Sequence, residues 1–557
     1  MKRLFLYVLL VVFFMECKVQ KTTNVVVKQQ QKHTIDRPKL IVGIVVDQMR
    51  YDYLIRFYSK YGEKGFKRLL NQGFNCENTH YNYIPTHTAV GHTSIYTGTT
   101  PSMHGIISNN WYDKYKKKTI YCVDDANYKT VGANLETSGG GKTSPNRLQV
   151  TTITDQLKLA QINKGKVIGI SIKDRAAMLP VGYSANAAYW FKGKKEAKFI
   201  SSSYYIDALP KWVQDFNASG VAKSYLKPWN TLYNINTYTE SIADNNNFEI
   251  EFKGEKTPTF PHNFPKLMQK NGNYDLLKTS PFGNTLLVDF AKATIKGEQL
   301  GKNDATDFLA MSFSSTDYIG HRFGANSKEI EDTYIRLDKE IERFLNFLDT
   351  EVGKQNYTLF LTADHAVIPV PSYLKKQKIK AGYFDMKSFK KYVNTITKTH
   401  FSSEELVENI SNFQIFLNKE KIKSLKLSVS DVSKVIAEEI ISFKGVYKTV
   451  TAQTLQQTNF TEGILHALQN GYNQKISGDI LIVPSPATVY YKHKGSTHGS
   501  GYSYDTHVPL IFYGKGIKQG STKRYIPIID IAPTMANLLK IESPNACTGK
   551  IILEVLE

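Results

Sequence analysis

Several features are scarce or missing in this chain of 557 residues, and each absence argues against a class of protein. There are four cysteines, and once Cys17 is set aside only Cys76, Cys122 and Cys547 remain, enough for one disulfide at most. We therefore predict neither a disulfide framework nor a cysteine metal site. No repeat or low-complexity block occurs, which disfavours solenoids and disordered tails. Beyond the N-terminus, no apolar run is long enough to cross a membrane.

Positive charge is abundant but scattered. The formal net charge is +21 at pH 7. A nucleic-acid-binding surface would need its Lys and Arg residues concentrated on one element. Here the basic runs, such as 116–118, 194–195 and 375–378, lie beside polar residues and are typical of solvated faces. We predict no nucleic-acid partner, although the excess charge can help to attract an anionic substrate.

The first residues are typical of an export signal. Two basic residues precede an apolar run over 4–15, which is too short to span a bilayer but suits a signal-peptide core. We predict a signal peptide over 1–17, a polar linker over 18–38 and one folded domain over 39–557. Cys17 lies where a bacterial lipoprotein would be cleaved and acylated, although the residues before it match poorly. The protein is therefore expected to be exported, either periplasmic or anchored to the envelope by lipid at Cys17.

Short apolar runs without alternation recur along the chain, and polar residues follow them. The runs cover 40–46, 167–172, 307–313, 357–361 and 508–512. Such runs suit strands that are buried on both faces, as in a parallel sheet. Amphipathic helical patterns occur at 150–161, 330–348 and 529–539. This alternation predicts an α/β fold with a mostly parallel central sheet flanked by helices.

Two regions break the alternation. Residues 184–292 are rich in Tyr, Asn and aromatic residues, and residues 371–478 are rich in Lys, Ser and Thr. We predict that both are insertions that cap the core, because loops above a sheet edge commonly carry specificity.

Carboxylates and imidazoles follow the ends of the predicted strands. They are Asp47, the pair Asp317 and His321 four residues apart, the adjacent pair Asp364 and His365, and His498. The carboxyl ends of parallel strands meet at one edge of a sheet, so these side chains should converge there. Each fragment alone is a weak signal. Together, three carboxylates and three imidazoles favour a dinuclear site with two Zn²⁺ ions over magnesium, which prefers oxygen ligands.

A hydroxyl-rich segment over 84–98 is predicted to be a loop that enters a short helix. A hydroxyl at a helix N-terminus meets unpaired N–H groups and the positive end of the helix dipole, which suits a phosphate group. Most such residues are ordinary N-caps, however. The pattern alone does not choose among Thr86, Thr88, Thr93 and Ser94.

Three further side chains are candidates for contacts with an anion: Asn109, Lys173 and Arg175. Lys173 and Arg175 directly follow a predicted strand, but by themselves they fit a solvated loop equally well, and Asn109 also fits an ordinary turn. His87, His92 and His104 surround the hydroxyl-rich segment and are expected to have core or capping roles, with support of the site as the alternative. The remaining histidines are assigned to the surface or to packing: His33, His80, His262, His400, His466, His493 and His507.

These fragments carry a resemblance to the alkaline phosphatase superfamily, and in particular to its PafA-type exported bacterial alkaline phosphatases. The matching stretches, in chain order, are IVGIVVDQMRYDYL, PTHTAVGHTSIYTGTTPSMHGI, GISIKDRAA, STDYIGH, LTADH and STHGSGYSYDTHVPLIFYG. They extend from about residue 40 to 515, so the resemblance covers nearly the whole mature chain. Ala366 departs from it, because many members have glycine after the Asp-His pair.

The resemblance implies a zinc-dependent hydrolase of small phosphate monoesters that acts through a phosphothreonine at Thr88. By position, the ligands of one zinc, which also binds Thr88, would be Asp47, Asp364 and His365. The ligands of the other would be Asp317, His321 and His498. Asn109, Lys173 and Arg175 match the groups that hold phosphoryl oxygens.

Charge bears on the substrate class. Two Zn²⁺ ions with three aspartates and two basic side chains leave the pocket positive, which suits a dianionic monoester better than a singly charged diester. One alternative is a phosphodiesterase or nucleotide pyrophosphatase of the same superfamily. Another is a non-catalytic basic surface protein that binds polyanions. A sulfatase is disfavoured because neither Cys nor Ser occupies position 88. The sequence does not indicate the oligomeric state.

Overall fold

The computed structural model describes residues 36–133 and 141–557. The predicted signal peptide, Cys17 and His33 lie outside the described residues. The chain divides into a unit of residues 1–36 and a second unit that spans Arg37–Glu557, to which the described helices and strands belong. Among the helices described, none is both long and apolar enough to cross a bilayer.

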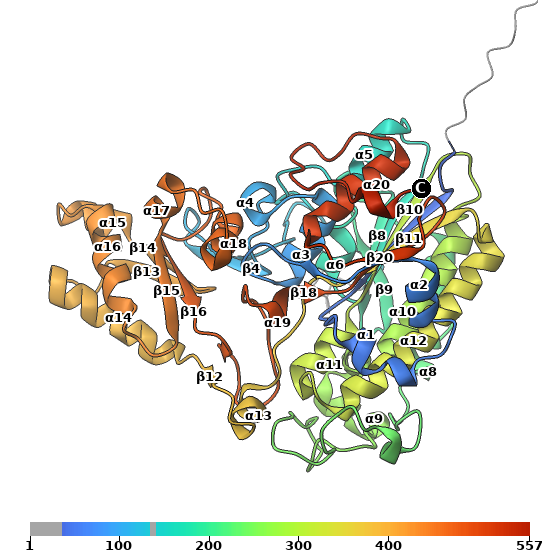
Figure 1. The fold of residues 1–557 in the computed structure, drawn as a ribbon, viewed down its shortest axis with the longest axis horizontal. Coiled ribbons are helices and arrows are strands. Elements are labelled where there is room, and N and C mark those ends of the chain that lie inside the picture. The colour runs from blue at the N-terminus through green and yellow to red at the C-terminus, as the bar shows by residue number, and fades with distance from the viewer. Residues whose placement is uncertain (1–35, 134–140) are drawn as a thin grey trace, which may run out of the picture. The chain divides into compact units, whose positions relative to one another are not determined.

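A ten-stranded sheet forms the centre of the second unit, in the order β20-β2-β19-β11-β1-β10-β7-β8-β9-β6 (Figure 1). Its five middle strands are parallel: β11 (Tyr357–Thr362), β1 (Leu40–Val46), β10 (Asp307–Phe313), β7 (Val167–Ser171) and β8 (Ala187–Lys192). Every residue of these strands is buried, which explains why the apolar runs show no alternation. The predicted α/β fold is confirmed.

The outer strands include antiparallel pairs. β19 (Leu510–Gly514) is antiparallel to β11 and to β2 (Phe74–Cys76), and β9 (Lys198–Ser202) is antiparallel to β8. The sheet ends at β20 (Gly520–Thr522) and β6 (Thr130–Val131). The expectation that the run 508–512 joins the parallel set was wrong. Burial on both faces produces the same apolar run in either strand direction, so the pattern does not encode direction.

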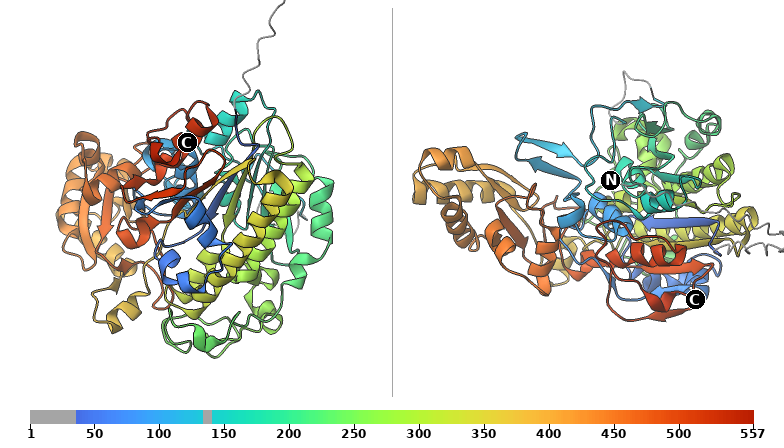
Figure 2. Two further views of the ribbon diagram at one scale, coloured as in Figure 1. Left: turned by 45° about the vertical axis from the view of Figure 1, so that its right-hand side comes forward. Right: turned by 90° about the horizontal axis from the view of Figure 1, so that it is seen from above.

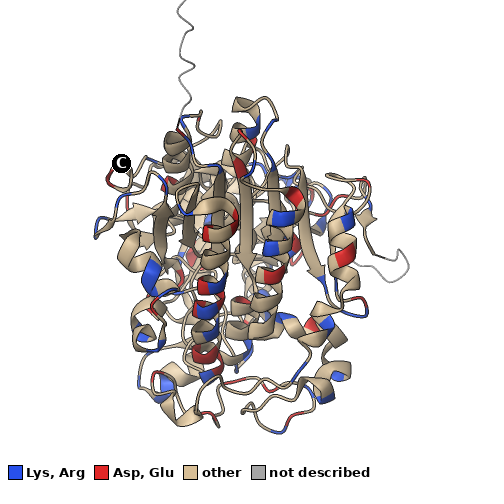
Figure 3. Cartoon of the chain, turned by 90° about the vertical axis from the view of Figure 1, so that its right-hand side faces the viewer, with Lys and Arg blue, Asp and Glu red and all other residues tan. Residues whose placement is uncertain are grey.

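Helices in two groups cover the sheet (Figure 2). One group contains α10 (Pro281–Glu298) and α12 (Lys328–Leu348), and the other contains α3 (Thr88–Thr97), α5 (Ile153–Ala160) and α20 (Ile531–Leu539). Local signals fix where they begin: Ser327 caps α12, and Thr152 and Asp155 form a capping box at α5. The three predicted helices are all present. Basic and acidic residues are interspersed along the helices in the view of Figure 3.

The region 184–292 is only partly an insertion, which corrects its predicted bounds. β8 and β9 belong to the central sheet, and α10 packs against β7 and β10. The aromatic residues in the strands, such as Trp190 and Phe199, are buried in the main core rather than exposed on a cap. What remains outside the sheet layer is 203–280, with the short helices α7 (Lys211–Ala218), α8 (Val221–Ser224) and α9 (Phe264–Leu267).

The second region forms a lobe with its own core. Its sheet has the order β13 (Val407–Ser411), β14 (Gln414–Leu417), β16 (Ile480–Pro484) and β15 (Val446–Thr451). α14 (Met386–Phe401) and α16 (Val429–Ile440) contribute to a separate hydrophobic cluster with these strands (Figure 1). Because β16 pairs with both β14 and β15, the lobe extends past the predicted end at residue 478.

Gly91 allows α3 to approach the chain after β11, and this contact yields a first prediction. A Cβ atom at Gly91 would lie 2.1 Å from the carbonyl oxygen of Asp364, so the backbone would have to move. Gly91→Ala should lower the free energy of unfolding by about 1–3 kcal/mol, measured by urea titration. At Gly62 the nearest atom would be 3.5 Å away, so Gly62→Ala should change stability by about 0.5 kcal/mol at most. Equal effects of the two variants would contradict the prediction.

Candidate functional site

Strand register brings the predicted ligands to one edge of the sheet. Val46, the last residue of β1, pairs with Phe313 at the end of β10, and Val45 pairs with Thr362 at the end of β11. Asp47 and Asp364 therefore leave the sheet at the same level. α11 (Ser315–Phe323) follows β10 and carries Asp317 in its first turn and His321 in its last. The predicted convergence of these segments is present.

The first group of candidate metal ligands consists of Asp47, Asp364 and His365, whose potential ligand atoms lie within 4.8 Å of one another. All three residues are 0% exposed. Within the described part of the chain, Asp47 Oδ1, Asp364 Oδ2 and His365 Nε2 have no hydrogen-bond partner. A buried polar atom without a partner costs free energy. Two carboxylate oxygens and an imidazole nitrogen in this state fit a divalent cation.

The electrostatics of these carboxylates also favour a cation. Burial raises the pKa of Asp47 well above its usual value, and the negative charges of Asp317 and Asp364 raise it further. Burial likewise raises the pKa of Asp364 to about 7, against the opposing effect of Lys173. Burial would raise the pKa of Asp317 as well, but His321 and Lys173 hold it well below its usual range. A divalent cation would stabilise the ionised form of all three.

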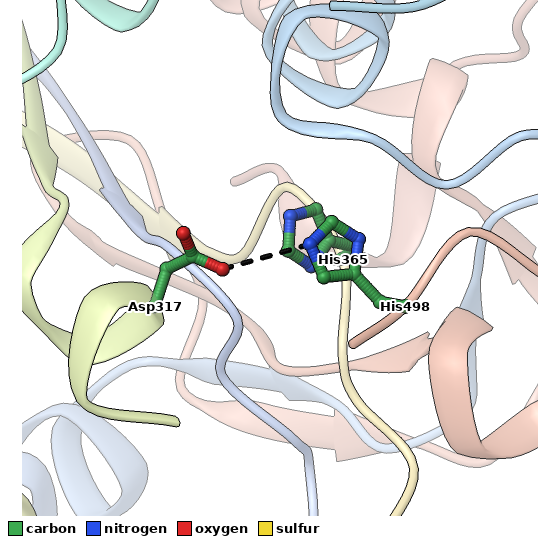
Figure 4. Close-up of side chains that lie close together, drawn as sticks. All are labelled: Asp317, His365 and His498. Carbon is green, nitrogen blue, oxygen red and sulfur yellow. Dashed lines mark ion pairs between the residues drawn. The ribbon is translucent and has the colours of Figure 1, made fainter. Parts of the chain in front are cut away.

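The second group surrounds Asp317. Ligand atoms of Asp317, His365 and His498 lie within 4.8 Å of one another, and Figure 4 shows the carboxylate facing the two imidazoles. Asp317 Oδ1 is 3.6 Å from His498 Nε2 and 3.1 Å from His321 Nε2. The rings of His365 and His498 stack with centroids 3.4 Å apart. The structure thus gathers all the implied ligands, with His365 close to both groups.

The three histidines are held in one orientation by main-chain carbonyls. Their Nδ1 atoms lie near the carbonyl oxygens of other residues: His321 near Ser496 at 2.8 Å, His365 near Ala366 at 3.0 Å and His498 near Thr86 at 2.7 Å. An Nδ1–H that donates to a carbonyl leaves the Nε2 lone pair for a metal. Burial lowers the pKa of His365 and of His498, which favours the neutral ring that a metal requires.

Thr88 is the first residue of α3 and is 1% exposed. Its hydroxyl oxygen lies 3.5 Å from Lys173 Nζ. The other three hydroxyls that the sequence left open have structural hydrogen bonds: Thr86 donates to the Ser500 carbonyl, Thr93 donates to the Ala89 carbonyl and Ser94 pairs with His104. The surroundings therefore favour Thr88 as the reactive hydroxyl.

The basic and amide groups lie beside the same hydroxyl. Lys173 Nζ is 2.6 Å from both Asp47 Oδ2 and Asp317 Oδ2, so it bridges the two ligand groups. Although burial opposes it, this pairing raises the pKa of Lys173. Arg175 Nη1 donates to the Tyr121 hydroxyl at 3.1 Å, and its pKa is also raised despite burial. Asn109 Oδ1 accepts the Ala89 N–H of α3 at 2.9 Å, so its amide nitrogen remains to donate.

Gln48 is a site residue that the sequence pattern did not reveal. Its main-chain N–H donates to Asp364 Oδ1 at 3.1 Å and its Nε2 donates to Asp317 Oδ1 at 2.6 Å, so it links the two groups. Its φ is +67°, an uncommon conformation for a residue with a side chain. A Cβ atom at Gly320 would lie 1.8 Å from Gln48 Oε1, so the glycine of the Asp-Tyr-Ile-Gly-His motif makes room for Gln48. Adjacency to Asp47 was the only signal in the sequence.

The histidines near α3 have supporting contacts. His92 Nδ1 lies 2.9 Å from the Thr88 carbonyl and 3.3 Å from Asp364 Oδ2. His87 Nδ1 lies 3.0 Å from the Ser108 hydroxyl. His92 therefore contacts both the start of α3 and Asp364, whereas the sequence favoured core or capping roles for these histidines.

An α/β sheet whose strand ends gather two groups of metal ligands around a buried hydroxyl is the arrangement of a metal-dependent hydrolase. Comparisons with known proteins agree. Residues 41–508 match the family described as type I phosphodiesterase / nucleotide pyrophosphatase. The chain belongs to this family, within the alkaline phosphatase superfamily.

Three relatives are similar over nearly the whole chain. A Myroides odoratus protein named calcium-transporting ATPase is 47% identical, covering 94% of this chain and 95% of its own. Alkaline phosphatase PafA of Elizabethkingia meningoseptica is 44% identical, covering 95% and 96%. The crystal structure of wild-type PafA matches with a TM-score of 0.90 and 45% identity, covering 94% of this chain and 100% of that one. The resemblance seen in the sequence is confirmed.

The position of Gln48 yields a prediction about metal binding. Gln48→Ala removes a hydrogen bond to Asp317 and should weaken zinc binding by about 10–100-fold, because partners of the ligands orient them. Competition with a chromophoric chelator measures this affinity. Gln72→Ala, at the exposed end of α2 (Phe66–Gln72), makes the same chemical change away from the site and should have no effect. Unchanged affinity in Gln48→Ala would show that Gln48 does not position the ligands.

Proposed function

We propose that the protein hydrolyses phosphate monoesters to an alcohol and inorganic phosphate, with Thr88 as the nucleophile. One observation carries the proposal: the buried Thr88 hydroxyl lies at the N-terminus of α3, beside an ammonium group that bridges two groups of metal ligands. The similarity to alkaline phosphatase PafA supports the same activity.

The residues present fit two zinc ions. Asp47, Asp364 and His365 would hold one, and Asp317, His321 and His498 would hold the other. Three imidazoles with Nε2 directed to the site favour zinc over magnesium. When bound, the two ions would supply Lewis acidity that lowers the pKa of the Thr88 hydroxyl and stabilises the departing alcohol oxygen.

The residues of the chain perform the remaining steps. After its proton passes to solvent, Thr88 Oγ1 forms a bond to phosphorus while the bond from phosphorus to the alcohol oxygen breaks. The departing oxygen takes up a proton from water, which leaves the free alcohol and a phosphothreonine. Lys173, Arg175 and the Asn109 amide hold the phosphoryl oxygens, and the first N–H groups of α3 add to this positive field. Water then attacks the phosphothreonine, releases phosphate and restores the Thr88 hydroxyl.

The charge of the site favours a monoester over a diester. The phosphoryl group of a monoester has three non-ester oxygens that can contact the cations and hydrogen-bond donors of the site. In a diester, a second ester group replaces one of these oxygens. The family also contains phosphodiesterases by its description, so a diesterase is the alternative. One relative is named an ATPase, and the terminal phosphoryl group of ATP has the same dianionic character, so ATP belongs among the substrates to be assayed.

The site of action is also proposed. Residues 1–17 would direct export, and the mature protein would be periplasmic or attached to the envelope by lipid at Cys17. The enzyme would then hydrolyse small phosphate monoesters outside the cytoplasm.

Removal of the proposed nucleophile provides the main test. Thr88→Ala should lower kcat for an aryl phosphate monoester by roughly 10³-fold or more, because no other hydroxyl is positioned to replace it among the described residues. Thr88→Ser, which keeps a hydroxyl, should retain more activity. Mass spectrometry of acid-quenched wild-type enzyme should find phosphate on Thr88.

Thr93→Ala is the matched control, since the Thr93 hydroxyl bonds within α3, and it should keep most of the activity. Full activity in Thr88→Ala would exclude the nucleophile assignment. Failure of zinc-loaded wild-type enzyme to hydrolyse any monoester would favour the non-catalytic alternative.

Arg175 should determine the preference for monoesters. Arg175→Ala should lower kcat/KM for the monoester by about 10²-fold, and for a matched diester by clearly less, because the diester offers one fewer charged oxygen. Arg147→Ala is a suitable control, because Arg147 is partly exposed and donates a hydrogen bond to the main-chain carbonyl of Tyr121 at 3.1 Å. Equal losses of kcat/KM for the monoester and the diester would show that Arg175 does not determine the preference for monoesters.

A further inference from the structure

A cavity of about 420 Å³ lies beside the candidate metal site. Part of its wall comes from the segments that build the site, including Pro85, His87 and His498. The rest comes mainly from the lobe that the second inserted region forms. Because the site and the cavity share His87 and His498, a substrate held at the site has the cavity as its direct neighbour.

Hydrogen bonds hold the lobe against the site at two points. Asn412, in the turn between β13 and β14, donates through Nδ2 to the Asn110 carbonyl at 2.7 Å, directly after Asn109. The Ile84 N–H, at the start of the hydroxyl-rich segment, donates to the Ala467 carbonyl of the lobe at 3.0 Å. Asn412 and Ile84 also line the cavity, so the fold itself sets the shape of the cavity.

The wall that the lobe contributes is mostly apolar. Its apolar side chains include Met386, Ile410, Phe413, Leu468, Leu481 and Val489. Charged side chains are few: among the described residues that line the cavity, Lys390 is the only lysine or arginine and Asp505 is the only acidic residue. A second phosphate group on a ligand would therefore meet no cluster of basic groups here.

Several polar side chains of the wall already have partners within the protein. Gln414 Oε1 accepts the Gly478 N–H at 2.7 Å, and the Tyr504 hydroxyl oxygen accepts the Ala487 N–H at 3.0 Å. Because these atoms are bonded, an apolar group can occupy the cavity without leaving them unsatisfied.

Tyr490 adds an exposed aromatic ring to the cavity. It is 60% exposed, and among the described residues its side chain makes no hydrogen bond and its ring stacks on no other ring. An aromatic side chain left open at a cavity is suited to pack against an apolar ligand.

The departing alcohol of the proposed reaction would lie on the same side of the site. The second group of candidate ligands, Asp317, His321 and His498, would face the departing oxygen. His498 Nε2 is 3.6 Å from Asp317 Oδ1, and His498 also lines the cavity. An organic group attached to the departing oxygen would therefore extend toward the cavity.

We propose that the cavity binds the organic group of the monoester, and that this group is apolar and uncharged, such as a substituted aromatic ring. The apolar wall and the open ring of Tyr490 favour such a group over a polyol or a second phosphate. The inference rests on the proposed function, because that function supplies both the phosphoryl group and the direction of the departing oxygen.

Binding of two phosphonates to the zinc-loaded full-length protein tests this assignment. In benzylphosphonate and 4-tert-butylbenzylphosphonate, a CH₂ group replaces the ester oxygen, so neither compound has an ester bond to hydrolyse. Calorimetric titration of the wild type should give a Kd about 10-fold or more lower for the tert-butyl compound, because four further carbons are buried. Inorganic phosphate, titrated alongside, reports on the phosphoryl site alone.

Two variants of the cavity wall locate the effect. Tyr490→Ala removes the exposed ring, and Ser411→Trp places a large side chain in the cavity from a partly exposed position. Each should reduce the advantage of the tert-butyl compound to about 3-fold or less, while the affinity for inorganic phosphate stays within about 2-fold of the wild type.

Tyr447→Ala is the matched control, because Tyr447 is 48% exposed on the same lobe but does not line the cavity. This variant should keep the full advantage of the tert-butyl compound. Equal affinities of the wild type for the two phosphonates would overturn the inference, and so would an advantage that both wall variants retain.

These binding measurements involve no turnover, so an unfavourable result leaves the tests of Thr88 unaffected and overturns the inference alone. If the binding preference is present but the wild type hydrolyses no monoester, the proposed function fails. The role of the cavity as a substrate site then fails with it.

Discussion

The burial of three carboxylates around one ammonium group is the constraint on which the site depends. Asp47 and Asp317 share Lys173, while Asp364 accepts a hydrogen bond from the backbone of Gln48. One ammonium does not neutralise three buried negative charges. Burial and the neighbouring carboxylates therefore raise the pKa values of Asp47 and Asp364. The folded chain thus concentrates negative potential where cations would bind. The fold tolerates this concentration because the large apolar core of the sheet stabilises the strands whose ends carry the charges.

The same arrangement accounts for the position of Thr88, the proposed nucleophile. α3 can approach the chain after β11 because Gly91 has no side chain, and this brings Thr88 near Lys173. The loop that carries His498 is held against the same helix entry, since His498 bonds to the Thr86 carbonyl. The packing of the core therefore fixes the candidate ligands, the Thr88 hydroxyl and the basic groups. A nucleophile held in this way would need little reorganisation before it attacks.

Much of this could be predicted from the sequence, for physical reasons. Buried parallel strands have uninterrupted apolar runs, so the residues after them could be placed at one sheet edge from the sequence alone. The choice of Thr88 among four hydroxyls needed the resemblance, because every candidate suits a helix entry. Gln48 could not be predicted, since its role depends on a positive φ and on space beside Gly320 that no local pattern encodes. The predicted bounds of both insertions differ from the structure. In the first region, β8 and β9 are rich in aromatic residues, as an inserted cap can be, yet they belong to the central sheet. In the second region, β16 belongs to the lobe although it follows the point where the composition changes.

The most direct test of the central claim is anomalous X-ray scattering at the zinc absorption edge from crystals of the zinc-loaded protein. The account predicts two strong peaks beside Thr88, one among Asp47, Asp364 and His365 and the other among Asp317, His321 and His498. A single peak, or peaks away from these side chains in fully loaded protein, would contradict it.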